Sequence, residues 1–423
     1  MPEIIPREQL DKLILEAGRV FTPTTPIDER ALFAGRRNQL VKVIDAINQK
    51  GQHAIIFGER GVGKTSLSNV LSSFLSRPGG VVLSPRVNCD GQDTFELVWK
   101  KVFDQITRKK GVPQVGFAPD TKKKRTNLVS DELPQLVTPD SIRHFLSNLS
   151  QGALPILILD EFDRLPQGVK VAFADMIKNL SDHAVGATLV LVGVADSIDD
   201  LIREHQSVER ALVQIRMPRM SVQEIEEIVN NGLQRLGMTI DEDAMARITM
   251  LSQGLPHYTH LLARDSARGA LSNGDLHITL GIVDSAIQKA LEDAQQSIRS
   301  AYHKATMSPR KNNLFADVLL ACALAPTDEL GFFAAQDLRN PMKNVTGKKY
   351  EIPSYAQHLN EFCDPKRGPI LTKTGAKRRF RFRFVNPLLQ PFIIMQGFAA
   401  GKLKNIARSA EAKSEATPEP ASD

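Results

Sequence analysis

The sequence is short of cysteine, of tyrosine and tryptophan, and of long apolar runs. Its 423 residues include three cysteines, four tyrosines and one tryptophan. Cys89, Cys322 and Cys363 stand far apart, which excludes the ligand spacing of a zinc site and favours reduced thiols in the cytoplasm. No apolar run reaches the ~18 residues that a membrane-spanning helix needs, and the first ten residues lack the pattern of an export signal. We therefore expect a cytoplasmic protein without a membrane partner.

The net charge is small, at +6, but it is unevenly distributed. Between residues 307 and 410, 17 Lys and Arg stand against 7 Asp and Glu, so the rest of the chain is net negative. A positive excess confined to one region indicates a polyanionic partner for that region. With 42% hydrophobic and 24% charged residues, the chain has a globular composition and is long enough for two or three domains.

Residues 53–66, HAIIFGERGVGKTS, contain the strongest motif. An apolar strand leads into the pattern G-x-x-x-x-G-K-[ST], and an amphipathic helix follows it. Glycines let several backbone N–H groups face a phosphate, and the helix N-terminus adds positive potential. A simple glycine turn is the alternative. The motif predicts ATP binding, with Lys64 on the outer phosphates and Thr65 on Mg2+. The expected binding residues are Gly58, Glu59, Arg60, Gly61, Val62, Gly63, Lys64, Thr65 and Ser66.

A second motif follows about a hundred residues later, in the stretch LPILILDEFDRLP at 154–166. An apolar strand ends there in Asp160 and Glu161, the acidic pair expected of a nucleoside triphosphatase. Asp160 would hold Mg2+ and its waters, and Glu161 would polarise the attacking water. Strands often end in acidic residues, but the pair is far more specific when a phosphate loop precedes it.

Further apolar strands are predicted at residues 81–87 and 188–194, in alternation with helical segments such as 94–106. This alternation predicts an α/β fold, in which a parallel sheet carries helices on both faces and binds ligands at the carboxyl ends of its strands. Residues 107–137 interrupt the pattern, because they are polar, locally basic and without periodicity. They are either a flexible solvated insertion or a loop that touches nucleic acid.

With these motifs in place, the sequence resembles AAA+ P-loop ATPases, in the branch that holds origin-recognition and initiator ATPases and the related STAND signalling ATPases. The resemblance covers roughly residues 27–305. It implies a P-loop NTPase core at 36–220 after an approach segment at 1–35, and an all-helical lid at 221–306. The lid helices are expected at 222–236, 242–252, 256–270 and 279–305.

The resemblance also implies roles for residues outside the two motifs. Asp196 stands where relatives have a residue that senses the terminal phosphate, and His257 stands where many have a second sensor arginine. Arg210 matches an arginine that reaches into the site of a neighbouring subunit in a homo-oligomer, with Arg216 and Arg219 as further candidates. A surface ion pair is the alternative for Arg210, and ordinary packing is the alternative for His257.

Residues 311–398 have a separate pattern. Helices are predicted at 314–325, 327–338 and 352–363, followed by two strands around a turn at Thr374-Gly375. Arg379, Arg381 and Arg383 alternate with phenylalanines in the second strand. This is the order of a winged helix, which initiator-type relatives carry in this place. The basic hairpin at 373–383 would contact DNA phosphates, or its charges are only a solvated outer face. A closing helix at 386–395 and a disordered tail at 399–423 follow.

The sequence as a whole predicts an ATPase that hydrolyses ATP with Mg2+ and couples the cycle to oligomer assembly and to DNA binding or remodelling. The alternative is a STAND-type nucleotide-gated switch that acts through protein partners, and a companion effector protein fits either interpretation. The expected catalytic residues are Lys64, Glu161, Asp196 and Arg210, and the expected metal ligands are Thr65 and Asp160.

Overall fold

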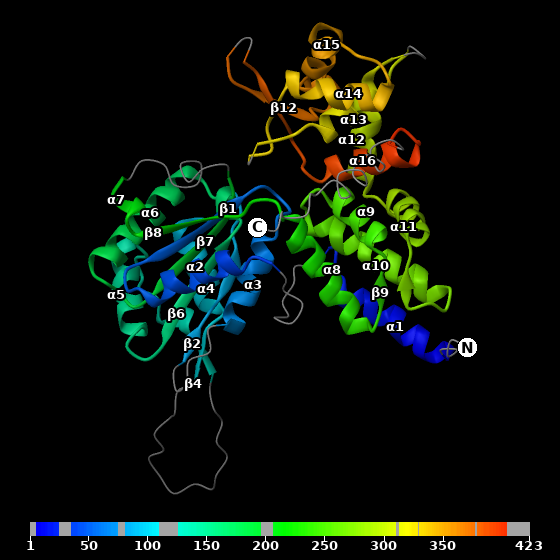
Figure 1. Cartoon of the computed structure of the whole chain (residues 1–423). Coiled ribbons are helices and arrows are strands. Elements are labelled where there is room, and N and C mark those ends of the chain that lie inside the picture. The colour runs from blue at the N-terminus through cyan, green and yellow to red at the C-terminus, as the bar shows by residue number, and fades with distance from the viewer. Residues whose placement is uncertain are drawn as a thin grey trace, which may run out of the picture. The chain divides into compact units, whose positions relative to one another are not determined.

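The computed structural model describes residues 6–24, 35–74, 81–109, 126–195, 206–309, 313–328, 330–376 and 379–403. They belong to two compact units (Figure 1). One is Pro26–Pro218, and the other combines Met1–Thr25 with Arg219–Asp423. Within the described ranges, no helix is long and apolar enough to cross a membrane.

A parallel sheet forms the middle of the unit Pro26–Pro218, as the α/β pattern predicts. The strand order is β2-β6-β7-β1-β8, with β3 also paired to β6, and all of these pairings are parallel. The strand expected at 81–87 is split in two around Pro85, because proline has no N–H to give to the ladder. The strands are β1 (His53–Gly58), β2 (Val82–Leu83), β3 (Arg86–Asn88), β6 (Leu154–Asp160), β7 (Thr188–Val194) and β8 (Leu212–Arg216).

Helices cover both faces of this sheet (Figure 1). One face packs an aromatic core in which the Trp99 and Phe103 rings stack 5.5 Å apart, and Phe173 joins them. Thr94 and Thr138 accept N-terminal hydrogen bonds and so fix where two of the helices begin. This face carries α4 (Phe95–Asp104), α5 (Pro139–Leu149) and α6 (Gln167–Asp182), and the opposite face carries α2 (Arg37–Asn48) and α3 (Lys64–Phe74).

The insertion at 107–137 has regular structure at both ends, which the sequence interpretation missed. β4 (Thr107–Lys109) and β5 (Thr126–Leu128) pair antiparallel, and the 3-10 helix η2 (Val129–Glu132) follows. Buried Val129 donates a backbone hydrogen bond of 2.9 Å to Ile106, so a long-range contact holds the two ends together. Residues 110–125 lie outside the described residues.

The other unit, called the helical unit, contains five helices within residues 219–306, all of which the structure describes. Three begin where predicted, but the helix expected at 279–305 is two helices separated at residues 293–295. The break lets α11 pack on α10 while α12 packs on α13 and α16, and such tertiary contacts decide helix ends more than propensity does. The helices are α8 (Val222–Leu236), α9 (Glu242–Ser252), α10 (Pro256–Ser272), α11 (Leu280–Glu292) and α12 (Gln296–Thr306), with a small parallel pair, β9 (Thr239–Ile240) and β10 (His277–Ile278).

The N-terminal helix α1 (Arg7–Val20) packs in this unit, against α8 and α10, rather than on the sheet. Phe21 lies so close to Gly232 that a Cβ there would stand 2.3 Å from the ring. The Glu16 carboxylate forms an ion pair with the Arg235 guanidinium, at a distance of 3.2 Å. Residues 6–21 are thus part of the helical unit, although the sequence assigned them to an approach segment.

The C-terminal part contains four helices and a three-stranded antiparallel sheet of order β11-β13-β12. The prediction of a helix at 327–338 is wrong. The Asp328 carboxylate accepts hydrogen bonds from the N–H groups of Leu330 and Phe332, and these bonds form a turn instead. β11 and a 3-10 helix, η5 (Ala335–Leu338), follow it. The other elements are α13 (Phe315–Leu324), α14 (Arg339–Thr346), α15 (Ile352–Phe362), α16 (Leu389–Ala399), β11 (Phe333–Ala334), β12 (Leu371–Thr374) and β13 (Arg381–Phe384).

The alternation predicted for β13 is present. Phe382 and Phe384 are buried, and the Phe382 ring stacks on Phe333 of β11. The closing helix begins at Leu389, three residues later than predicted. Gln390, at its start, is buried, donates to the carbonyl of Ala323 at 2.8 Å and accepts from Arg219 at 2.7 Å.

Candidate active site

The phosphate loop connects β1 to α3 and depends on three glycines. Gly58, Gly61 and Gly63 have φ values of 151°, 88° and 95°, a region that other residues rarely adopt. A Cβ on Gly58 would lie 2.4 Å from the carbonyl oxygen of Met217. Backbone conformation and close packing therefore both require glycine at the first position of the motif.

Lys64 lies inside this loop. Its side chain is buried, and its ammonium donates hydrogen bonds to the carbonyls of Gly58 at 2.9 Å and Glu59 at 2.8 Å. Burial lowers the pKa of Lys64 to about 8, and the carboxylates of Asp163 and Asp160 oppose that shift. The loop thus holds a cation at its centre whose charge is only partly stabilised by its surroundings.

The two motifs meet at the carboxyl ends of their strands, although β7 stands between β1 and β6 in the sheet. Thr65 Oγ1 donates a hydrogen bond of 3.0 Å to Asp160 Oδ2. Asp160 is 4% exposed, and its other oxygen accepts from the backbone N–H of Glu161 at 2.8 Å. The structure therefore brings together the hydroxyl and the carboxylate that the sequence predicts as metal ligands.

Glu161 follows Asp160 in a left-handed conformation, with φ 56°. Strained backbone of this kind in a non-glycine residue is concentrated at functional sites. Its carboxylate is half-exposed and pairs with Arg164 at 2.7 Å. Nearby, Asp163 Oδ1 accepts from the N–H of Val194 at 2.8 Å, which ties this turn to the end of β7.

Arg86 is a site residue that the sequence interpretation missed. Its Nη2 donates to Asp160 Oδ2 at 2.7 Å, and its Nη1 donates to Asn69 of α3. β3 pairs parallel with β6 so that Asn88 lies beside Asp160, which brings the Arg86 side chain within reach of the carboxylate. No motif marks this residue, because its role depends on the pairing of two strands distant in the sequence.

Arg210 does not join this cluster within its own chain. It is exposed, and its carbonyl accepts a hydrogen bond of 3.1 Å from Gln52, at the amino end of β1. The phosphate loop follows the carboxyl end of the same strand. Arg210 therefore lies at the amino ends of the parallel strands, whereas Lys64 lies beyond their carboxyl ends.

The other predicted residues have different surroundings. Asp196 lies outside the described residues. Arg216 ends β8 beside Phe57, whereas Arg219 lies in the helical unit and donates to Gln390. His257 donates through Nδ1 to the carbonyl of Pro23 at 2.7 Å, and burial lowers its pKa. These contacts are those of a packed histidine.

The donor set fits a magnesium-bound triphosphate. A hydroxyl and a carboxylate are hard oxygen ligands of the kind that Mg2+ prefers, and Thr65 and Asp160 supply them next to the glycine loop. Lys64 donates to the Gly58 and Glu59 carbonyls, which places its ammonium inside the loop.

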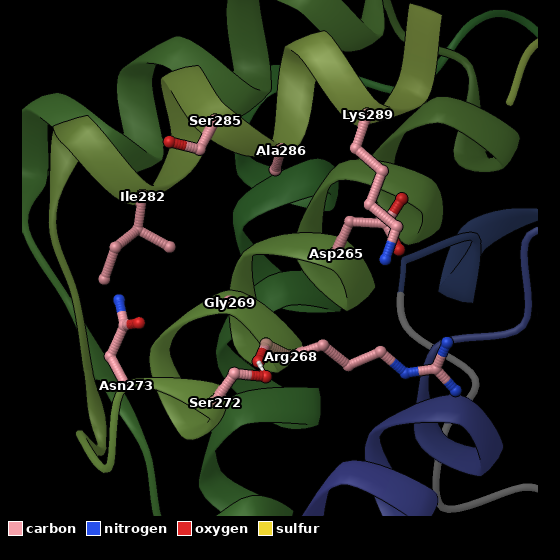
Figure 2. A pocket seen from close by; sticks show the side chains of 9 residues that line it. All are labelled: Asp265, Arg268, Gly269, Ser272, Asn273, Ile282, Ser285, Ala286 and Lys289. Atoms are coloured by element: carbon pink, nitrogen blue, oxygen red, sulfur yellow. Dashed lines mark hydrogen bonds between the residues drawn. The ribbon is translucent and has the colours of Figure 1, made fainter. Parts of the chain in front are cut away.

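A separate hollow of about 330 Å³ lies between α10 and α11 of the helical unit (Figure 2). Asp265, Arg268 and Lys289 are the charged residues of its lining. None of the predicted site residues lines it, so it is distinct from the phosphate loop.

Comparison with known proteins finds similarity to a known family over part of the core. Residues 47–202 match the model of a family described as a AAA domain. A Walker-type ATPase of Pyrococcus abyssi is similar in structure, with 17% identity, a TM-score of 0.50, and coverage of 88% of this chain and 99% of that chain. The Aeropyrum pernix ORC2 protein, in ADPNP and ADP complexes, has 15% identity, a TM-score of 0.49 and coverage of 93% and 98%. The P. abyssi likeness shows a shared fold.

Proposed function

We propose that this protein, whose residues 47–202 match the model of a AAA domain, binds ATP with Mg2+ and hydrolyses it to ADP and phosphate. The observation that carries the proposal is the 3.0 Å hydrogen bond from Thr65 to Asp160 beside a loop that already encloses Lys64. Loop, lysine, hydroxyl and buried carboxylate are the parts that phosphoryl transfer requires.

Each residue has a defined role in this proposal. The loop N–H groups and Lys64 bind the outer phosphates. Thr65 and Asp160 would hold Mg2+, which supplies positive charge against the phosphate oxygens when bound. Glu161 accepts a proton from, or polarises, the attacking water, and for that it must leave Arg164, its partner at 2.7 Å.

The experiment is to measure phosphate release and nucleotide binding for wild type and Glu161→Gln. The variant should retain nucleotide affinity and lose about 100-fold or more in turnover, the usual scale for removal of a general base. Glu96→Gln, an exposed glutamate on α4, is the matched control and should behave as wild type. The proposal would be refuted if the wild-type protein bound no nucleotide at saturating Mg2+.

We further propose that the protein assembles into a homo-oligomer in which Arg210 acts on a neighbouring subunit. Two observations support a role in a neighbouring subunit. Arg210 is exposed, and it lies at the amino ends of the strands, away from the phosphate loop of its own chain. An arginine delivered to the transferring phosphoryl group from another chain raises turnover by about 10³-fold or more in related chemistry.

The third part of the proposal is that residues 311–398 form a winged helix and that this domain binds DNA through residues 373–383. Arg381 pairs with Asp328 at 2.9 Å, and Arg383 lies over the Phe332 ring. Lys373 donates to Asn360 Oδ1 at 3.1 Å and lies over the Phe380 ring. These three cations are engaged within the fold, whereas Arg379 is exposed and is the better candidate for a phosphate contact.

Salt dependence tests the DNA proposal. Binding of a labelled duplex, followed by fluorescence anisotropy, should weaken steeply between about 50 and 200 mM salt, because each phosphate contact releases a counterion. An affinity that does not change over this range, or that is too weak to measure at the lower salt, contradicts DNA binding and leaves the ATPase proposal standing.

A further inference from the structure

One oxygen of the Asp160 carboxylate accepts hydrogen bonds from two donors. Thr65 Oγ1 reaches Oδ2 at 3.0 Å, and Arg86 Nη2 reaches the same atom at 2.7 Å. The Asp160 side chain is 5% exposed and that of Arg86 is 28% exposed. The ion pair between the guanidinium and this carboxylate is therefore close and largely removed from solvent.

A buried carboxylate needs a compensating positive charge or several hydrogen bonds. Lys64 does not supply that charge by direct contact, since its ammonium donates to the Gly58 and Glu59 carbonyls. Among the described residues, Arg86 is the cation that pairs directly with Asp160. The electrostatic balance of the acidic motif consequently depends on a residue from a third strand.

The same oxygen faces the Thr65 hydroxyl, and these two groups are the proposed magnesium ligands. A divalent cation held there would stand beside the guanidinium, and like charges at such a distance repel strongly where water is scarce. The Arg86 guanidinium and a magnesium ion therefore cannot both make a close contact with Asp160 Oδ2.

We propose that Arg86 and Mg2+ compete for Asp160 Oδ2, and that magnesium binding requires the guanidinium to be displaced. This inference rests on the ATP and magnesium binding proposed above. Neutral acceptors stand next to the guanidinium, since Arg86 already donates to Asn69 through Nη1, and Asn88 Oδ1 lies 3.5 Å from Nη2. Arg86 thus positions the acidic motif and sets how much Mg2+ the site needs.

Two variants and two measurements test the proposal. Arg86→Gln keeps a hydrogen-bond donor and removes the charge, and Arg86→Met removes both. The first measurement is the Mg2+ concentration that gives half-maximal binding of a fluorescent ADP, at fixed nucleotide. The second is the thermal midpoint of the nucleotide-free protein in the absence of Mg2+, a readout that does not involve turnover.

Both variants should lower the Mg2+ midpoint by about tenfold, the effect of removing one close like charge. Both should also lower the thermal midpoint of the nucleotide-free protein, Met more than Gln, because Asp160 loses its counter-charge. Arg164→Met is the matched control. It removes a cation that pairs with Glu161 instead, and it should leave the Mg2+ midpoint unchanged.

The outcomes are distinguishable. If the wild type binds ADP with Mg2+ but neither Arg86 variant lowers the Mg2+ midpoint, the displacement proposal is overturned and the ATPase proposal survives. A raised Mg2+ midpoint in the Arg86 variants would also overturn the displacement proposal, and it would indicate that Arg86 is a phosphate ligand. If the wild type fails to bind nucleotide at any Mg2+ concentration, both proposals fall together.

Discussion

Thr65 Oγ1 lies 3.0 Å from Asp160 Oδ2, although 95 residues separate them in the sequence. The contact exists because Asp160 is the last residue of β6, and the loop that follows the carboxyl end of the parallel strand β1 leads to Thr65 in the first turn of α3. β7 lies between those strands in the sheet, so the carboxylate reaches the loop across the end of an intervening strand. The fold of the chain thereby holds the hydroxyl and the carboxylate together.

Thr65→Val replaces this hydroxyl with a methyl group of nearly equal size. Asp160 then loses one donor, and the free energy of unfolding should fall by about 1.5–3 kcal/mol, the usual scale for a hydrogen bond to a charged group. Magnesium-dependent ATP affinity, measured by calorimetry, should fall at least about tenfold. Thr65→Ser keeps the hydroxyl and should stay close to wild type. Equal Mg-ATP affinity in the valine variant would show that the hydroxyl holds no metal.

The lowered pKa of Lys64 predicts a specific dependence of folding stability on pH. Its pKa lies at about 8 in the nucleotide-free fold, against a usual value of 10.5. Below pH 8 both folded and unfolded forms carry the charge, and its burial cost is present in full. Between about pH 8 and 10.5 the unfolded form binds more protons, so this lysine's contribution makes the folded state more stable as pH rises through that window.

ATP binding should change in the opposite direction over the same window. Phosphates need the charged ammonium, so affinity should fall as pH rises above about 8, and binding should take up protons there. Calorimetry at pH 8.5 in two buffers of different ionisation enthalpy measures that uptake. Lys64→Met should bind ATP at least about 100-fold more weakly, and its stability should lack the rise with pH. Identical heats in both buffers would count against a depressed lysine pKa.

Arg210 is predicted to act between subunits, which a mixing experiment can show. Arg210→Ala should retain nucleotide affinity, because the residue lies at the amino ends of the strands, away from its own phosphate loop. Alone, Arg210→Ala and Glu161→Gln should both be nearly inactive. Mixed, they should recover part of the turnover, since some neighbouring pairs then combine an intact Glu161 with an intact Arg210. Turnover that stays at the level of the separate variants would mean that Arg210 does not act in trans.

Arg367 and Arg379 should respond differently to alanine. Arg367 pairs with Glu361 at 3.1 Å, donates to the Ala305 carbonyl at 2.9 Å, and lies 3.7 Å from the centre of the Phe315 ring. Arg367→Ala should therefore lower the free energy of unfolding by about 2–4 kcal/mol.

Arg379→Ala is the comparison, because this side chain is exposed. Its stability should change by less than about 0.5 kcal/mol, while the salt slope of DNA binding should fall by about one. Denaturant unfolding and anisotropy titrations measure the two effects. A large loss of stability in Arg379→Ala, or an unchanged salt slope, would move the DNA contact away from this hairpin.

Local patterns account for much of the fold. The fully buried runs of β1, β6 and β7 were predictable because strands covered on both faces are apolar throughout. Helix starts at Thr138 and Ser221 were predictable because their side chains accept hydrogen bonds from the first turn. Long-range contacts overrode local preference elsewhere, as where α11 ends and α12 begins, and in the turn that Asp328 forms.

By itself, the sequence determined the glycine loop, its lysine and hydroxyl, and the acidic strand end, because each is a local pattern whose chemistry tolerates few other residues. Only the tertiary structure decided which groups share Asp160. The parallel pairing of β3 with β6 brings Arg86 to a carboxylate 74 residues away, and no local pattern records which strand will become a neighbour. The association of α1 with the helical unit has the same cause, since Phe21 finds its packing partner Gly232 only once the chain has folded.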